Sequence, residues 1–215
     1  MRSATMTVPA LTEAPPSAAR RAPTQRRSRE RMESLLSTAA TLIEAKGSDG
    51  LKMSEVAEKA GVSIGSLYQY FPDKAAIIRT LAERYDAQGR ACIVAELDAV
   101  RDMPGLRQAM GRLTDGYYQM FLDEPVMRDI WSGTQADKTL RDMDLAENRL
   151  LGGMLTDVLV RLRPQADRAD LETSAFLAMH LVGAAVRLAI SVDRTEGEAL
   201  VATFKRMMLK EILPE

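Results

Sequence analysis

The sequence predicts an all-α fold, and three observations support this prediction. Ala, Leu, Met, Arg and Glu are prominent among the 215 residues, whereas aromatic residues make up only 5%, a composition that favours helices over strands. Apolar residues recur at steps of three and four, and no segment shows the alternation expected of a strand. Pro, Gly and potential capping residues divide the chain at intervals typical of helices in globular proteins.

Residues 1–25 are rich in Pro, Ala, Thr and Ser, which predicts a disordered tail. The tail leads into a basic cluster made of Arg20, Arg21, Arg26, Arg27, Arg29 and Arg31. Two interpretations of this cluster stay open. It is either an arm that follows DNA phosphates or enters the minor groove, with Arg27 among its contacts, or a solubilising segment.

Two helices are expected after the tail. Apolar residues between Met32 and Ile43 recur on one helical face, and Gly47 would end this helix by adopting a left-handed conformation. A second, shorter helix is expected over 54–60, and Gly61 breaks it.

Capping residues mark the start of the next two helices. Ser63 can cap a third helix over 64–70, because its side-chain oxygen can accept an N–H from the exposed helix start. That helix would end at Phe71-Pro72, since the residue before a proline disfavours the α conformation. Asp73 can cap a fourth helix that begins at residue 74. Further helical segments are expected near 105–123, 125–133, 136–163, 166–192 and 195–212.

The charge distribution separates the N-terminal part from the rest. Residues 1–80 carry 12 Lys and Arg against 8 Asp and Glu, whereas residues 81–215 carry 17 against 22. A basic N-terminal part on an acidic remainder indicates a polyanionic partner for the first part only.

Several function classes find no support in the composition. The single cysteine, Cys92, excludes an internal disulfide, fits a reducing cytoplasm and is interpreted as a small buried residue. With one histidine, His180, the chain has no residues for a conventional zinc site. No glycine-rich phosphate loop or activated nucleophile is evident, so we expect neither an enzyme nor a cofactor. The apolar run from Ala175 to Ile190 is too short and too polar to span a membrane, and no secretory signal precedes it.

A helix, a glycine turn and a second helix within about 20 residues form the helix-turn-helix plan, which places its second helix in the DNA major groove. Here that helix would present small and polar residues outward, and Gln69 could pair with an adenine edge. Tyr68, Tyr70 and Lys74 could reach phosphates. The residues expected at DNA are Arg27, Lys52, Ser54, Ser63, Ile64, Gly65, Ser66, Tyr68, Gln69, Tyr70 and Lys74.

The string MSEVAEKAGVSIGSLYQYFPDKAAI, from Met53 to Ile77, closely resembles the N-terminal domain of the tetracycline-repressor (TetR) family. The resemblance implies an all-α homodimer whose first three helices, within residues 26–73, bind DNA. It also implies that residues 74–215 form a helical domain for effector binding and dimerisation. One departure is Lys52, where the family often has a threonine that caps the second helix.

The C-terminal part supplies candidates for both remaining roles. The segment from Ala175 to Ile190 and the last helix carry enough apolar residues to cover a partner chain as well as their own core. Two DNA-reading helices in such a dimer would reach half-sites about 34 Å apart. The candidates for an effector cavity are Tyr117, Phe121, Trp131, Met143, Leu150 and Met154.

The sequence leaves two interpretations of the whole chain. The first is a homodimeric repressor of a palindromic operator that a small, apolar effector releases. The second is a DNA-binding protein without an effector, controlled by its amount or by a protein partner. An empty cavity larger than ~300 Å³ in the second domain would count against the second interpretation.

Overall fold

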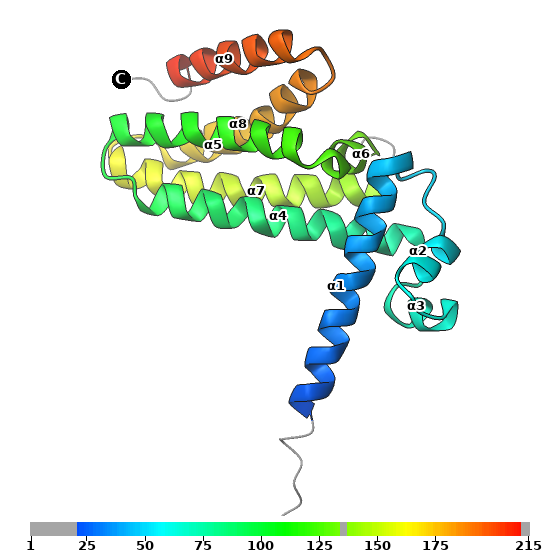
Figure 1. The fold of residues 1–215 in the computed structure, drawn as a ribbon. Helices are drawn as coiled ribbons and strands as arrows, with labels where there is room; N and C mark the ends of the chain where they lie inside the picture. The colour runs from blue at the N-terminus through cyan, green and yellow to red at the C-terminus, as the bar shows by residue number, and fades with distance from the viewer. Residues whose placement is uncertain (1–20, 134–136, 212–215) are drawn as a thin grey trace, which may run out of the picture.

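The computed structural model describes residues 21–133 and 137–211, and within these ranges every regular element is an α-helix (Figure 1). The predicted all-α fold is therefore confirmed. In chain order the helices are α1 (Arg21–Lys46), α2 (Met53–Lys59), α3 (Ile64–Tyr70), α4 (Lys74–Asp98), α5 (Met103–Asp123), α6 (Pro125–Gly133), α7 (Lys138–Leu162), α8 (Arg168–Ala189) and α9 (Arg194–Glu211).

Local signals set the boundaries of the first helices. Gly47 and Gly61 have φ angles of +79° and +66°, in the left-handed region that glycine adopts without a steric cost. The Ser66 N–H donates to the Ser63 hydroxyl oxygen at 3.1 Å, which caps α3. Asp73 caps α4 in the same way, because its carboxylate accepts from the Ala76 N–H. These turns and caps are the ones that the sequence predicts.

Helix α1 begins earlier than the sequence pattern indicates. We expected an irregular tail up to residue 25, but the helix starts at Arg21; residues 1–20 of the expected tail lie outside the described residues. Pro23 falls in the first turn, where its missing N–H removes no intrahelical hydrogen bond. Arg26 and Glu30 form an ion pair at 2.9 Å one turn apart. The basic cluster is therefore carried by a helix from Arg21 onwards.

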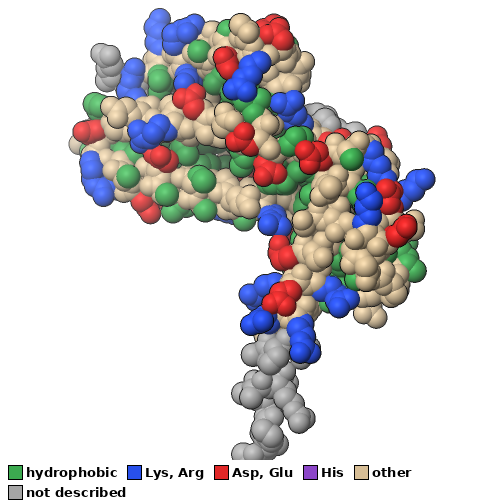
Figure 2. All heavy atoms as spheres, in the orientation of Figure 1, with side chains coloured by type: hydrophobic (Ala, Val, Ile, Leu, Met, Phe, Trp, Pro, Cys, Tyr) green, Lys and Arg blue, Asp and Glu red, His purple; other side chains and the backbone are tan. Residues whose placement is uncertain are grey.

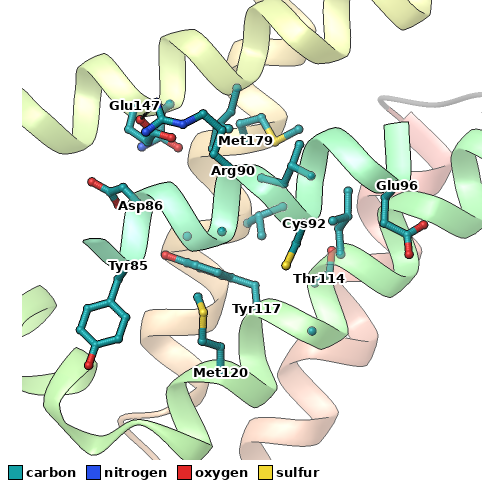
Figure 3. Close-up of a pocket in the computed structure, with 18 of the residues that line it drawn as sticks. Tyr85, Asp86, Arg90, Cys92, Glu96, Thr114, Tyr117, Met120, Glu147 and Met179 are labelled. Carbon is teal, nitrogen blue, oxygen red and sulfur yellow. Dashed lines mark hydrogen bonds and ion pairs between the residues drawn. The ribbon is translucent and has the colours of Figure 1, made fainter. Parts of the chain in front are cut away.

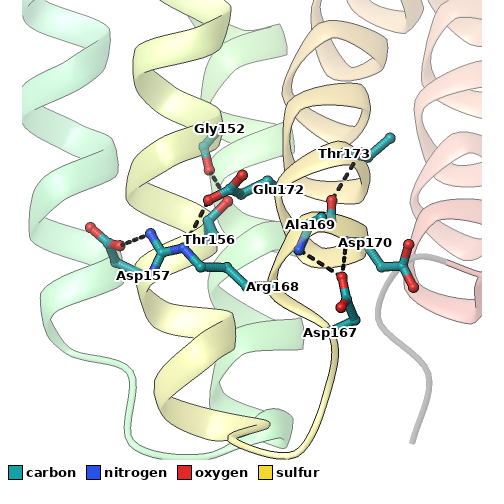
Figure 4. A network of polar contacts seen from close by, with 9 residues as sticks. All are labelled: Gly152, Thr156, Asp157, Asp167, Arg168, Ala169, Asp170, Glu172 and Thr173. Carbon is teal, nitrogen blue, oxygen red and sulfur yellow. Dashed lines mark hydrogen bonds and ion pairs between the residues drawn. The ribbon is translucent and has the colours of Figure 1, made fainter.

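Figure 1 shows two parts, which we call the head (α1–α3) and the bundle (α4–α9). In the bundle, α4, α5, α7 and α8 lie alongside one another, and α9 packs on α8 and α5. The short α6 contacts α1, α4 and α5, so it lies between the head and the bundle. Helices α7 and α8 lie side by side near Gly152 of α7 (Figure 4). Their backbones approach closely there, and an added Cβ at Gly152 would lie 2.9 Å from the Phe176 Cα. Only glycine permits this approach.

The molecule has two hydrophobic cores, and the boundary between them lies within the bundle and not between the head and the bundle. The head core joins α1–α3 to α6 and to adjoining parts of α4, α5, α7, α8 and α9; its buried residues include Leu35, Val56, Leu67, Ile77, Phe121, Ile130 and Trp131. The distal core lies further along the bundle and includes Leu106, Met110, Leu155, Leu159, Ala175 and Met208. The head is thus anchored in apolar packing that extends into the bundle.

Helix α8 is the one described helix whose length and composition would allow it to cross a membrane. It extends beyond the apolar run noted in the sequence, because it begins at Arg168. In this fold α7 covers one side of it and α9 another.

Candidate DNA-binding surface and ligand cavity

The outer face of α3 presents the residues that the helix-turn-helix pattern predicts. Ile64 and Tyr68 are 43% and 51% exposed, and Gly65 and Gln69 are exposed beside them. Leu67 points the other way and is fully buried in the head core. Because successive residues of a helix point in directions about 100° apart, α3 has one anchored face and one free face.

Gly65 has no role inside the molecule that requires glycine. Its φ angle is not positive, since Gly47 and Gly61 are the only described glycines with that property. An added Cβ at Gly65 would meet no described atom within 4 Å. A glycine at this exposed helical position destabilises the helix by about 1 kcal/mol relative to alanine. The absence of a side chain at Gly65 therefore matters only if another molecule approaches α3 closely.

Some of the other residues expected at DNA are simply exposed, and others form hydrogen bonds within the molecule. Lys52 and Ser54 are exposed at the start of α2, and Lys52 provides no side-chain cap, as its chemistry predicts. Tyr70 is half-buried against the head core, and its hydroxyl accepts a hydrogen bond from the Ser28 hydroxyl at 3.3 Å. The Lys74 Nζ donates to the carbonyl oxygens of residues 48 and 49, so it ties α4 to the loop after α1.

Arginine side chains surround the part of α1 that extends beyond the rest of the head. Arg26, Arg27, Arg29 and Arg31 are all exposed there, and Figure 2 shows blue side chains gathered around this end of the helix. The exposed arginines fit both interpretations of the cluster, an arm that follows phosphates and a solubilising segment.

A cavity of about 390 Å³ lies inside the bundle between α4, α5, α6, α7 and α8. Its apolar lining includes Met110, Leu113, Met120, Met127, Leu151, Met179 and Val182 (Figure 3). The volume exceeds the ~300 Å³ that separates the two interpretations of the sequence. The lining takes side chains from both hydrophobic cores, so the cavity is a gap between them.

Two of the six predicted ligand residues, Tyr117 and Trp131, line this cavity. The Phe121 ring is fully buried behind them, edge-on to both rings with centroids 5.1 and 5.9 Å away. Phe121 therefore belongs to the wall and does not face the cavity.

The other three predicted ligand residues lie elsewhere. Leu150 is 44% exposed on the outer face of α7. Met154 borders surface grooves beside α7, and Met143 packs against the head core. We withdraw Phe121 and these three from the cavity on geometric grounds.

The polar residues of the cavity were not predicted from the sequence. Asp86 and Arg90 on α4 meet Glu147 on α7 at one end (Figure 3), and Asp144, also on α7, acts electrostatically on Asp86. The Arg90 guanidinium pairs with the Glu147 carboxylate at 2.9 Å. Burial, together with the Glu147 and Asp144 carboxylates, raises the pKa of Asp86 to about 7. The sequence offered one sign of these polar residues, the spacing of one helical turn between Asp86 and Arg90. That spacing is also typical of a solvated helix face, so it does not indicate a cavity.

Cys92 also lines the cavity and is exposed. The expectation that it is buried was wrong, because the helix α4 is open to the cavity at this turn. Since the chain has no other cysteine, this thiol is a unique chemical label beside the cavity.

Helix α6 connects the cavity with the head. Met127 and Trp131 line the cavity from its inner face. On the other face of α6, two residues from each of them, the Asp129 carboxylate accepts a hydrogen bond from the Ser48 backbone N–H at 2.6 Å, in the loop after α1. One short helix thus touches both the cavity and the loop after α1.

Comparison with known protein families agrees with this two-part geometry. Residues 35–81 match the model described as bacterial regulatory proteins, tetR family, and residues 104–215 match the tetracyclin repressor-like C-terminal domain. The chain belongs to the TetR family. The TetR resemblance of the head is thereby confirmed, and the match extends through the bundle of this transcriptional regulator. No curated protein sequence matches the chain.

Solved structures of other regulators share the fold. A TetR-family regulator from Pectobacterium atrosepticum has a TM-score of 0.67 at 21% identity, over 89% of this chain and 97% of that chain. FadR from Bacillus subtilis, in complex with stearoyl-CoA, gives 0.64 at 16% identity, over 85% and 97%. A regulator from Saccharomonospora viridis, in complex with choline, gives 0.66 at 18% identity, over 86% and 97%.

Proposed function

We propose that this TetR-family regulator is a homodimeric repressor that binds a palindromic operator through α3 and is released by a small molecule in the cavity. The observation that carries the proposal is the 390 Å³ cavity joined to the head by α6. The same cavity weighs against the alternative of a regulator without an effector.

The exposed face of α3 supports sequence-specific DNA binding. Gly65 leaves space for the helix backbone to approach base edges, and the Ile64 side chain can contact a thymine methyl group. Gln69 offers a paired donor and acceptor for adenine. The exposed Tyr68 hydroxyl, Lys52, Ser54 and Arg27 are suited to phosphates.

Ser63, Ser66, Tyr70 and Lys74 were also expected at DNA, and we keep them as proposed supports of the surface. Each one has an intramolecular hydrogen bond that holds α3 or α4 in place. The Ser63 and Tyr70 hydroxyls accept in these bonds and Ser66 donates its backbone N–H, so each of the three hydroxyl groups can still donate its O–H to a phosphate. The Lys74 ammonium group has three N–H donors and can do the same.

Exposed apolar residues on α8 and α9 support a dimer. Leu177, Leu181 and Leu188 recur at helical spacing on the outer face of α8 and are 36–54% exposed; Met207 on α9 is 63% exposed. A second copy of the chain is the occupant we propose, because a symmetric dimer would pair two heads with the two halves of a palindrome.

The proposed release uses α6. A ligand that fills the space beside Met127 and Trp131 would displace α6, and Asp129 would transmit the displacement to the loop after α1 through Ser48. The ligand acts as an inducer if it binds more tightly to the head spacing that does not fit the operator. Two structural neighbours hold stearoyl-CoA and choline, which supports a ligand-binding role for the fold without indicating a ligand for this chain. A cytoplasmic location follows from the proposed role.

The experiment that tests this proposal is selection of bound molecules from a pool of random DNA duplexes by the full chain at two salt concentrations. We expect a palindrome to be enriched at both salts. Leu181→Glu should give a monomer in sedimentation and lose the palindrome while keeping salt-sensitive binding. Salt-sensitive binding of the unchanged protein without any enriched sequence would overturn the proposal.

A further inference from the structure

The two ends of the cavity differ in charge compensation. At one end Glu96 and Arg112 form an ion pair at 2.7 Å, so their charges offset each other. At the other end three carboxylates line the cavity: those of Asp86 and Glu147 (Figure 3), and that of Asp144, which acts electrostatically on Asp86. The lining contributes one basic side chain there, Arg90.

Arg90 is already engaged by one of these carboxylates. Its guanidinium donates to the Glu147 Oε2 at 2.9 Å. The Glu147 Oε1 is buried and finds no hydrogen-bond partner among the described residues. A buried carboxylate oxygen without a donor is unfavourable, and most such atoms in folded proteins are paired. A donor on a bound molecule would satisfy this oxygen.

Asp86 shows the same shortage of positive charge. The groups around it are Glu83 and Arg90 on its own helix and Asp144 and Glu147 on α7. Burial and the surrounding carboxylates raise its pKa, and Arg90 alone opposes them.

A second basic side chain, Arg187 on α8, acts on the neighbouring Tyr117. Burial raises the pKa of the Tyr117 phenol, and Arg187 lowers this pKa by a smaller amount. The three carboxylates of the acidic end still outnumber Arg90 and Arg187. The cluster thus holds more negative than positive charge when all its carboxyl groups are ionised.

Aromatic and apolar groups complete the cavity. Tyr117 and Trp131 line it, and aromatic faces attract cations. Met120, Met127 and Met179 supply an adaptable apolar surface for the rest of a ligand.

From this arrangement we infer that the effector is a cationic amphiphile, whose protonated nitrogen lies among Asp86, Glu147 and Tyr117 and whose apolar body lies along the methionines. The inference rests on the proposed function, because it describes the ligand of the same cavity. A carboxylate or phosphate group at this end would be repelled by three acidic side chains, whereas an N–H donor would pair with the free oxygen of Glu147.

Three probes with the same apolar body test the charge of the ligand: octylamine, octan-1-ol and octanoate. Their binding to the full chain is measured as protection of Cys92 from the thiol-specific reagent dithiodipyridine, relative to the unliganded rate. We expect half-maximal protection by octylamine at a concentration at least tenfold below that of octanol, with octanoate weakest.

Substitutions test which carboxylates bind the protonated amine. Asp86→Asn and Glu147→Gln should each weaken protection by octylamine about tenfold and leave protection by octanol unchanged. Asp142→Asn makes the same change of charge on the exposed face of α7 and is the control. It should leave protection by octylamine and by octanol unchanged. Because octylamine stays protonated, its affinity should rise up to about tenfold from pH 6 to pH 8 as Asp86 ionises, and this rise should vanish in Asp86→Asn.

The outcomes separate the two proposals. Equal protection by all three probes, or strongest protection by octanoate, would overturn the cationic ligand and leave the ligand cavity in place. Absence of protection by every probe would overturn the cavity as a ligand site, and with it this inference.

Discussion

The two hydrophobic cores of this regulator differ in what they connect. The head core includes residues of α1–α6 and of adjoining parts of α7, α8 and α9, and it holds the DNA-binding helices to the base of the bundle. The distal core joins α4, α5, α7, α8 and α9 at the other end. The cavity lies between them and takes lining residues from both. A molecule that fills the cavity therefore changes the packing between the two cores. One of them, the head core, contains the buried residues of α1–α3.

The largest effect is expected from Phe121→Ala, which tests how far the head core depends on one buried ring. Phe121 is fully buried in the head core, edge-on to Tyr117 and Trp131. We expect its loss to lower the free energy of unfolding by about 3–5 kcal/mol, measured by urea denaturation. Leu150→Ala, at an exposed position, is the control and should change stability by less than about 0.5 kcal/mol. Similar values for both variants would mean that the head core does not depend on this ring.

Asp129→Ala removes the contact between α6 and the loop after α1. A hydrogen bond to a charged group contributes roughly 1.5–3 kcal/mol, and we expect a loss of stability in that range. Hydrogen exchange of the Ser48 amide should become faster, since this N–H donates to Asp129. Asp142→Ala, on the exposed face of α7, should leave that amide protected. An unchanged exchange rate in Asp129→Ala would show that α6 does not hold the loop.

The acidic end of the cavity should make stability depend on pH. The pKa of Asp86 is about 7 in the folded protein and about 3.9 in an unfolded chain, so the folded state binds more protons between these values. Stability is therefore highest at the acidic end of this window and falls as the pH rises towards 7, by up to about 1.4 kcal/mol per pH unit. Urea denaturation at pH 5, 6, 7 and 8 measures the slope. Asp86→Asn should flatten it, and a slope that persists in this variant would assign the effect to other groups.

The smallest expected effect concerns α3 alone. Gly65→Ala adds a methyl group where no described atom lies within 4 Å, so the fold should be as stable as before or more stable. Affinity for the selected operator should fall at least tenfold, about 1.4 kcal/mol, in a fluorescence anisotropy titration. Gly111→Ala in α5, another position with nothing within 4 Å, is the matched control. Full operator affinity in Gly65→Ala would mean that DNA does not approach α3 closely.

The head could be predicted well because its signals are local. Gly47, Gly61, Ser63 and Asp73 each determine the conformation of their own turn, whatever packs around them. The start of α1 could not be predicted in this way. The helix runs past the last packed residues into solvent, so no apolar period marks its first turns.

The cavity could be predicted only in part, because its lining depends on packing between distant helices. Leu150 and Leu151 are adjacent in α7, yet a rotation of about 100° places the first in solvent and the second on the cavity. Asp86 and Glu147 are 61 residues apart, and each alone resembles a solvated residue. Only the contact between α4 and α7 brings them to the same end of the cavity.

The close approach of α7 and α8 at Gly152 has a mechanical consequence. Their backbones already touch there, so these two helices cannot move closer together to make room for a ligand. A ligand that needs more space must therefore displace one of the other helices that line the cavity, α4, α5 or α6. Helices α4 and α6 both contact α1, so a displacement of either one changes packing in the head.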